Sequence, residues 1–180
     1  YHRLISRNEV GGDPGCLAIS VEAFHAEAGQ RHDRFPSAML ATATHDQKRG
    51  EEVRARLAVL SEIADEWADL ARRWLAALPP PDPKAGLMIL QTVIGAWPLG
   101  LAASHRYGLE RYHERLAGWL VKALREAKQQ TSWDRPDETF EQAAREYLAQ
   151  LLDADREIVR EIEQFVIRIA PAPLYCTFHD

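Results

Sequence analysis

Residues 38–50 read Ala-Met-Leu-Ala-Thr-Ala-Thr-His-Asp-Gln-Lys-Arg-Gly, and this segment ends in the densest group of reactive side chains in the chain. Its first part, 38–44, is short and mostly apolar and ends in β-branched Thr42 and Thr44, which indicates a buried strand. A histidine, a carboxylate and two cations follow at once. Because parallel sheets carry their chemistry at the carboxyl ends of their strands, residues 45–49 are the first candidate site.

The rest of the chain is predicted to be almost wholly helical. Apolar residues at helical spacing predict a helical hairpin over 53–78, with a possible second helix from Trp67, a buried helix to about Ala96, a long helix over 112–129, and helices over 140–151 and 158–169. An earlier helix is predicted from its cap at Ser20 to about Gln30. The breaks fall at His32–Pro36, at the extended linker Pro79–Pro83 and at Thr131–Pro136. The fold class is therefore mainly α, with one or two short strands near the N-terminal third.

The bulk composition fits one globular domain of 180 residues, since 46% of them are hydrophobic and 27% charged. The net charge of −5 gives no basic footprint for nucleic acid. Cys16 and Cys176 lie far apart and fit no metal spacing, which predicts reduced thiols and a cytoplasmic location. The chain opens on Tyr1 without a signal peptide, so we expect it to begin inside a longer reading frame.

One uncharged run, 86–103, approaches the length of a membrane span. Polar Gln91 and Thr92 stand at its middle, and Gly95 and Pro98 interrupt it. A short buried helix that ends before Pro98 is therefore predicted, and no membrane partner.

The polar cluster after the predicted strand has a structural interpretation beside the functional one. Asp46 can be a cap for a helix that begins near Lys48, with Lys48 and Arg49 in a solvated first turn. Two cations at a helix N-terminus oppose the helix dipole, however. That conflict favours an acidic or polyhydroxyl partner for Lys48 and Arg49.

Four separated segments, in order, resemble the maltooligosyltrehalose synthases, which are glycosidases of the α-amylase superfamily. They are Asn8–Pro14 (Asn-Glu-Val-Gly-Gly-Asp-Pro), Ala41–Arg56 (Ala-Thr-Ala-Thr-His-Asp-Gln-Lys-Arg-Gly-Glu-Glu-Val-Arg-Ala-Arg), Gln91–Pro98 (Gln-Thr-Val-Ile-Gly-Ala-Trp-Pro), and Lys122–Lys128 leading to Thr131–Trp133. The resemblance spans roughly residues 3–165, and motifs in register are far more specific than one alone. The family usually has Thr where Gln47 stands and Asp where Glu52 stands. Neither change removes a catalytic carboxylate.

The resemblance implies the end of the seventh strand of a (β/α)8 barrel for the His-Asp pair. Asp46 would then be the third acidic residue of the machinery, which supports an oxocarbenium-like transition state, and His45 would bind the sugar beside it. Retaining glycosidases also need a nucleophile and a general acid/base about 5 Å apart. No segment here resembles those two, so we expect them before Tyr1 and expect the chain alone to be inactive.

The implied reaction is that of a (1→4)-α-D-glucan 1-α-D-glucosylmutase, an isomerase of trehalose biosynthesis that acts on a maltooligosaccharide. Lys48 and Arg49 would hold the glucose that turns, while Trp97 and Trp133 would present their faces to sugar rings. For either tryptophan, a place in the core is an equally typical use. No cofactor and no metal is predicted, and the partner is the rest of the parent polypeptide.

The implied organisation has three parts: 1–50 as the end of the catalytic-barrel segment, 51–170 as a helical insertion, and 171–180 as an atypical tail unlike the family. Two other functions stay open from the residues alone. One is an all-helical metal phosphohydrolase with a His-Asp dyad, suggested by His25, His32 and Asp33 upstream of residues 45–46. The other is a helical interaction module without activity.

Overall fold

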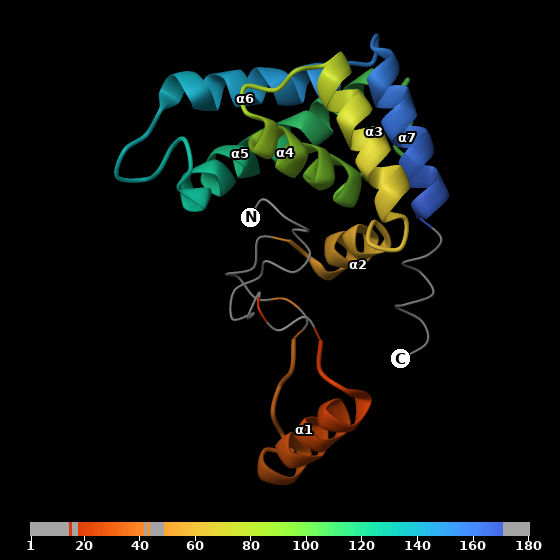
Figure 1. The fold of residues 1–180 in the computed structure, drawn as a ribbon, viewed down its shortest axis with the longest axis vertical. Helices are drawn as coiled ribbons and strands as arrows, with labels where there is room; N and C mark the ends of the chain where they lie inside the picture. Colours follow the sequence, from red (N-terminus) through yellow and green to blue (C-terminus); the bar gives the residue numbers. More distant parts are fainter. Residues whose placement is uncertain (1–14, 16–17, 42, 44–48, 171–180) are drawn as a thin grey trace.

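The structure, a computed structural model, describes residues 15, 18–41, 43 and 49–170 (Figure 1). The described residues form seven helices: α1 (Val21–Arg34), α2 (Glu51–Val59), α3 (Ala64–Ala77), α4 (Pro83–Gly95), α5 (Arg106–Ala127), α6 (Glu138–Leu151) and α7 (Glu157–Ile169). The mainly helical fold class and each helix expected from residue 51 onward are thereby confirmed. Both cysteines, the Asn8–Pro14 motif and the tail 171–180 lie outside the described residues.

Helix α4 is the centre of the fold and contacts α2, α3, α5 and α6. Ten of its thirteen residues are buried, as the uncharged run from residue 86 predicts. Its start differs from the prediction, because Pro83 is its first residue and not the end of a linker. Asp82 caps it by accepting a hydrogen bond from the backbone N–H of Ala85 at 2.8 Å. A proline without an N–H is well placed there, since the first N–H of a helix has no partner within the helix.

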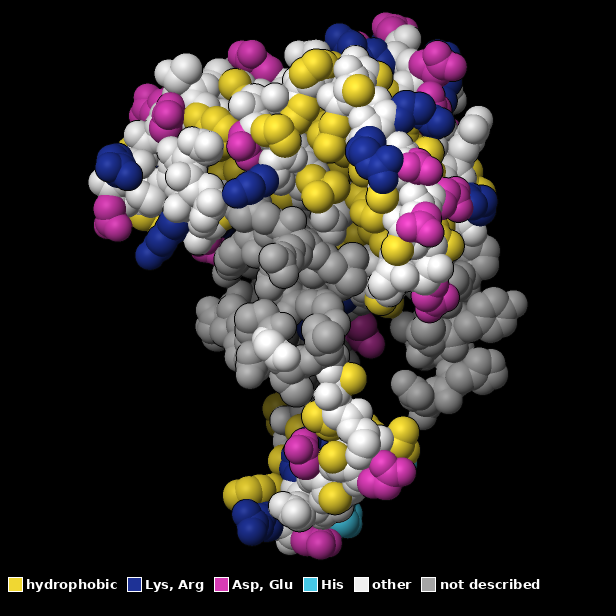
Figure 2. All heavy atoms as spheres, viewed as in Figure 1, with side chains coloured by type: hydrophobic (Ala, Val, Ile, Leu, Met, Phe, Trp, Pro, Cys, Tyr) yellow, Lys and Arg dark blue, Asp and Glu magenta, His cyan; other side chains and the backbone are white. Residues whose placement is uncertain are grey.

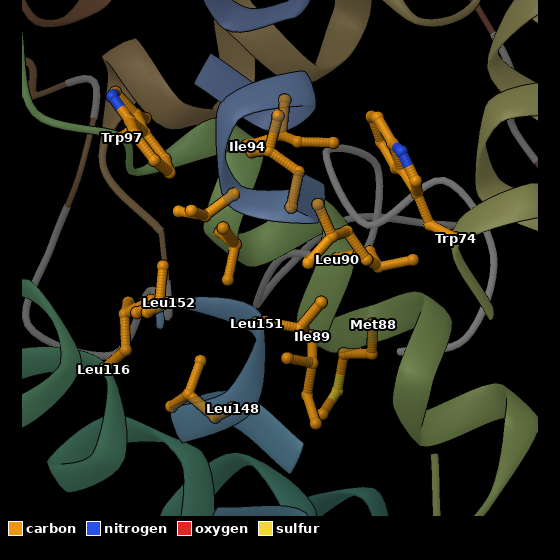
Figure 3. Close-up of a cluster of buried hydrophobic side chains, with 14 of the residues drawn as sticks. Trp74, Met88, Ile89, Leu90, Ile94, Trp97, Leu116, Leu148, Leu151 and Leu152 are labelled. Carbon is orange, nitrogen blue, oxygen red and sulfur yellow. The ribbon is translucent and has the colours of Figure 1, made fainter. Parts of the chain in front are cut away.

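The hydrophobic core forms where α4 meets its neighbours (Figure 3). Ile89 and Leu90 of α4 face Leu148 and Leu151 of α6, and Leu116 of α5 closes one side. None of these five side chains is more than 5% exposed. The apolar stripes read from the sequence for α5 and α6 therefore mark the core faces of these helices.

Helices α3 and α7 form the other half of the core and lie side by side in Figure 1. The rings of Trp67 and Phe165 stack with centroids 6.1 Å apart, and Trp74 meets Phe165 edge-on at 5.9 Å. The Trp74 indole N–H donates to Glu161 of α7 at 2.8 Å, and Arg73 pairs with the same carboxylate. These hydrogen bonds hold the pKa of Glu161 below its usual range, led by the indole bond.

The hairpin over 53–78 is two helices, as the second apolar stripe suggested. The break between them is a tight turn at 60–63, where the N–H groups of Leu60, Ser61 and Glu62 donate to the carbonyls three residues earlier. No helix among the described residues is both long enough and apolar enough to cross a membrane.

The N-terminal part departs from the prediction in two ways. The predicted strand 38–44 is not confirmed, because its described residues, 38–41 and 43, form no strand and are exposed, Met39 by 98%. A strand is stable only beside another strand that takes up its backbone hydrogen bonds, and the described residues contain none. The first helix also extends beyond Gln30 to Arg34, through the predicted polar break, because polar residues such as His32 and Asp33 tolerate a helical backbone when nothing buries them.

Helix α1 stands apart from the other helices and buries none of its residues (Figure 1). Ser20 caps it as predicted, accepting from the backbone N–H of Ala23 at 3.2 Å. Hydrophobic side chains show on this arm at the bottom of Figure 2. The exposed ones on the arm and its flanks are Ile19, Val21, Phe24, Phe35, Met39 and Leu40.

Candidate functional site

Three of the six predicted site residues, Arg49, Trp97 and Trp133, are described, whereas His45, Asp46 and Lys48 lie outside the described residues. The arrangement around Arg49 nevertheless bears on all of them. Helix α2 begins at Glu51, and its N-cap is Gly50. The structural interpretation, in which Asp46 caps a helix that starts near Lys48, is therefore wrong for this helix.

Arg49 precedes α2 and is buried, with only 4% of its surface exposed. Its guanidinium carbon lies 5.2 Å from the centre of the Trp119 ring on α5, which is cation–π geometry. The first turn of α2 carries Glu51 and Glu52, two anions that suit the helix dipole. Arg49 is thus not part of a solvated first turn, and it joins the segment 41–56 to α5.

Arg56 holds the end of the same segment against α4. One guanidinium nitrogen donates to the carbonyl oxygens of Ile94, Gly95 and Trp97 at 3.2, 3.1 and 2.8 Å. Arg115 of α5 donates to the Ala96 carbonyl at 3.0 Å. The last carbonyls of a helix have no partner within the helix, and the negative end of its dipole attracts cations, so these two arginines complete α4. Burial lowers the pKa of Arg56.

The close fit of α2 on α4 also depends on Gly95. A methyl group at this position would lie 2.8 Å from Cγ1 of Val53 and 3.1 Å from Cγ of Leu57. Helix α2, which contains the last residues of the motif Ala41–Arg56, therefore packs directly on the end of α4, which lies in the motif Gln91–Pro98. Sequence reasoning gave no role to Arg56 or Gly95, and the only signal that pointed to them was their place inside those motifs.

Trp97, predicted to contact sugar, is buried in the structure with 4% of its surface exposed. Its indole N–H donates to the Leu101 carbonyl at 3.0 Å, and its ring meets Tyr112 edge-on at 5.7 Å. The place in the core that the sequence left open is where the structure puts it. In this arrangement the ring offers no open face to a ligand.

Trp133 is exposed by 55% and lies in the loop between α5 and α6. The guanidinium carbon of Arg125 lies 5.1 Å from the centre of its ring, so one face is supported by a cation. Lys128 ends α5 in the left-handed conformation, with φ of 51°, and turns the chain into this loop.

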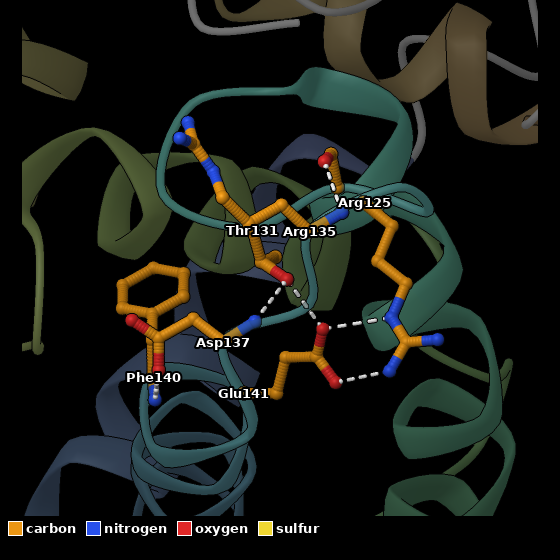
Figure 4. A network of polar contacts seen from close by, with 7 residues as sticks. Arg125, Thr131, Arg135, Asp137, Phe140 and Glu141 are labelled. Atoms are coloured by element: carbon orange, nitrogen blue, oxygen red, sulfur yellow. Dashed lines mark hydrogen bonds and ion pairs between the residues drawn. The ribbon is translucent and has the colours of Figure 1, made fainter.

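A buried polar network fixes the Trp133 loop (Figure 4). Glu141 of α6 accepts two hydrogen bonds from the Arg125 guanidinium, at 2.7 and 2.8 Å, and a third from the Thr131 hydroxyl at 2.6 Å. The Thr131 oxygen in turn accepts from the backbone N–H of Asp137, the residue that caps α6. The bond from Arg125 is the main cause that lowers the pKa of Glu141, against the opposing effect of burial. The loop and the two helices thus form one connected unit.

Glu141→Gln is expected to reduce the free energy of unfolding by about 2 kcal/mol at neutral pH, because it removes the charge that Arg125 pairs with. The depressed pKa adds a pH effect. The stabilisation is present above the unfolded-state pKa of about 4.3 and is lost as the pH falls through the folded-state pKa. Urea unfolding of the wild-type chain and of Glu141→Gln is measured at pH values from about 3 to about 7, which span the titration of a carboxyl group. The two free energies of unfolding should converge as the pH falls.

The matched control is Glu146→Gln, the same substitution at an exposed position of α6. It should change stability by less than about 0.5 kcal/mol at every pH. Equal effects of the two substitutions would contradict a stabilising role for the network.

Comparison with known proteins identifies the relatives of this chain. No family model matches the chain. Proteins named as maltooligosyl trehalose synthases in two strains of Mycobacterium tuberculosis are 39% identical to it over 153 residues, or 84% of the chain and 19% of each relative. The chain belongs to the maltooligosyltrehalose synthase family. It spans about a fifth of the length of these curated relatives, as expected for one part of a larger enzyme.

Solved structures of the family agree. A maltooligosyltrehalose synthase from Arthrobacter ramosus matches with a TM-score of 0.81 and 32% identity, covering 96% of this chain and 21% of that one. Another crystal structure with the same enzyme name gives a TM-score of 0.83 at 28% identity, over 97% of this chain and 23% of that one.

Family membership decides between the functions that the residues alone left open. His25 and His32 of the phosphohydrolase alternative lie on the exposed helix α1. Within the described part of the chain, no three His, Cys, Asp or Glu side chains are grouped as ligands for a metal ion. The relatives are named as synthases, and this chain matches about a fifth of their length.

Proposed function

We propose that this chain is the part of a maltooligosyltrehalose synthase that supplies a transition-state-stabilising carboxylate and one wall of the substrate pocket. The parent enzyme would convert the reducing-end α-1,4 linkage of a maltooligosaccharide into an α,α-1,1 linkage. The observation that carries the proposal is the 39% identity to named synthases across 84% of the chain. The cytoplasm is the proposed location, and the rest of the enzyme polypeptide is the proposed partner.

We infer the three-part organisation from the sequence motifs together with the packing. Residues 1–50 would complete the seventh strand region of a catalytic barrel, 51–170 would be a helical insertion, and 171–180 an atypical tail. The exposed residues at 38–41 support this, since apolar Met39 and Leu40 need a neighbouring sheet to cover them. The exposed apolar side chains of α1 need a covering surface for the same reason.

In the proposed reaction, a carboxylate outside this chain attacks the anomeric carbon of the linkage nearest the reducing end. The bond to the departing glucose breaks, and a general acid protonates its oxygen. That glucose turns in place, its own anomeric hydroxyl attacks the covalent intermediate, and the hydroxyl proton passes to the same group acting as base. Asp46 stabilises the positive charge in both transition states, and His45 hydrogen-bonds the sugar.

The glucose must turn without escaping, and water must be kept from the intermediate, because water would give hydrolysis. The contacts of Arg49 and of α2 with the other helices support a wall with that purpose. Arg49 is fixed on Trp119, and Arg56 is fixed on the end of α4. Lys48 would point a cation at the glucose hydroxyls, and Arg49 would follow it in the chain. The exposed Trp133 would offer the face of its ring to another part of the substrate. Trp97 would support the wall from the core.

A chimaeric enzyme tests the function directly. The matching 153-residue segment of the Mycobacterium tuberculosis relative is replaced by the segment of this chain. Because the wall and Asp46 are retained, the chimaera should convert maltopentaose into a product without a reducing end, at a rate within about tenfold of the parent. The assay combines loss of reducing sugar with chromatography of the product.

The 180-residue chain alone serves as the control and should give no product, since the nucleophile and acid are elsewhere. A chimaera that has the helical circular dichroism of the parent yet leaves maltopentaose unchanged would refute the proposal.

A further inference from the structure

One face of α5 contacts both the end of α4 and the residue that precedes the cap of α2. Tyr112, Arg115 and Trp119 lie at positions i, i+3 and i+7 of α5, which places them on the same side of the helix. The Tyr112 hydroxyl donates to the Val93 carbonyl at 2.6 Å, and Arg115 donates to the Ala96 carbonyl at 3.0 Å. These bonds hold α5 against the end of α4, and Trp119 continues the same face.

Trp119 holds Arg49 on its ring. The guanidinium carbon of Arg49 lies 5.2 Å from the ring centre, and only 4% of the Arg49 surface is exposed. A cation–π contact is stronger when the cation is withdrawn from water, because water then screens its charge less. The indole itself is half-buried and packs against the hydrophobic core. Arg49 is therefore held by a ring whose own position depends on the packing of α5 on α4.

Helix α2 begins directly after this contact. Its N-cap is Gly50, and Arg56 near its other end donates to three carbonyls at the end of α4. The chain from Arg49 to Arg56 is thus held at both ends, by α5 at the first residue and by α4 at the last. Asp46 lies three residues before Arg49, so the two Cα atoms are at most about 11 Å apart.

The contact also changes the part that Arg49 is suited to play. The sequence suggested that Arg49 holds the glucose together with Lys48. In the structure the Arg49 guanidinium lies over the Trp119 ring and is buried, which leaves little of its surface for a sugar hydroxyl. A residue held in this way is suited to fixing the chain beside the site.

We propose that Trp119 is a positioning residue of the enzyme, which acts through Arg49 on the candidate site. Its ring holds Arg49 so that Asp46 and Lys48, which precede Arg49 in the chain, reach the reacting sugar at the correct place. The inference rests on the proposed function for the roles of Asp46 and Lys48. It adds to that function a residue seventy positions away from Arg49 in the sequence.

The experiment measures Trp119→Ala in the chimaeric enzyme, with maltopentaose as the substrate. A displaced carboxylate weakens the transition state more than the bound substrate, so kcat should fall on the order of 10–10²-fold while KM changes less than about threefold. The turning glucose should also escape more often, and water attack on the intermediate then gives maltotetraose beside the released glucose. The fraction of these hydrolysis products should therefore rise. Trp119→Phe keeps an aromatic face for the guanidinium and should restore most of kcat.

A second substitution tests whether Trp119 acts through Arg49. Arg49→Met removes the cation but keeps a long side chain. In that background Trp119→Ala should lower kcat by less than about twofold further, because the contact is already lost. If the two losses multiplied in full, Trp119 would act independently of Arg49 and the inference would be wrong.

Trp67→Ala is the matched control, since it removes a buried tryptophan of α3 that stacks on Phe165 of α7. It should leave kcat and the hydrolysed fraction within about twofold of the unmodified chimaera. An active chimaera in which Trp119→Ala changes kcat and the hydrolysed fraction no more than Trp67→Ala overturns the positioning role and leaves the proposed function standing. A chimaera that is inactive before any substitution overturns the proposed function, and this inference with it.

Discussion

Asp46→Asn in the chimaeric enzyme is expected to lower the rate of conversion of maltopentaose on the order of 10²–10³-fold. The amide has the shape of the carboxylate but no charge with which to stabilise an oxocarbenium-like transition state. Because the loss occurs in the transition state, kcat should fall far more than KM rises. Initial rates over a range of maltopentaose concentrations separate the two.

Asp69→Asn is the control for this substitution, because Asp69 is exposed on α3 and pairs with the equally exposed Arg72 one turn away. It should leave the rate within about twofold of the parent chimaera. If Asp46→Asn kept half of the activity, the role that the resemblance gives Asp46 would have to be abandoned.

Trp74→Ala is expected to destabilise the chain by about 4 kcal/mol, the largest loss of stability among the substitutions considered. The indole is 1% exposed and packs edge-on against both Trp67 and Phe165. Its removal leaves a large cavity between α3 and α7 and takes a hydrogen bond from Glu161. The change in the free energy of unfolding is measured by urea titration, with the helical circular dichroism signal at about 222 nm as the readout.

Trp133→Ala is the same substitution at an exposed position, where the contact with Arg125 is lost. This substitution should lower the free energy of unfolding by less than about 1 kcal/mol. Trp74→Phe keeps a ring in the core and should fall between the two. A similar cost for Trp74→Ala and Trp133→Ala would contradict the packing of α3 on α7.

The sequence predicted the helices from α2 to α7 from the helical spacing or the uncharged run of their apolar residues, and two of them also begin with a side-chain cap. Asp137 and Asp82 cap their helices with side chains that reach a backbone N–H three residues away. Such interactions are local, so a single sequence is enough to find them. The start of α4 was misjudged by one residue for the same local reason, since a proline fits the first position of a helix as well as a linker.

The candidate site was less predictable because its geometry depends on contacts between distant segments. Arg49 was expected to face solvent or sugar, and the structure shows it buried against Trp119, seventy residues away in the sequence. Trp97 was assigned two possible places, and only the packing of α4 against α5 put it in the core. Arg56 has no local signal, because its three acceptors are carbonyls at and just beyond the end of another helix.

The sequence was sufficient for the helical class, for the existence of the helices and, through four motifs in order, for the enzyme family. These depend on short-range periodicity, caps and the identity of residues. The start of α5 at Arg106 and the end of α1 at Arg34 differ from the predicted 112 and 30. The tertiary structure was needed to show that α4 is the centre of the fold and that α2 packs on it through Arg56 and Gly95. It was also needed to show that the predicted strand at 38–44 is not formed at its described residues. A helix satisfies its own backbone hydrogen bonds, whereas a strand and a binding wall need partners from elsewhere in the structure.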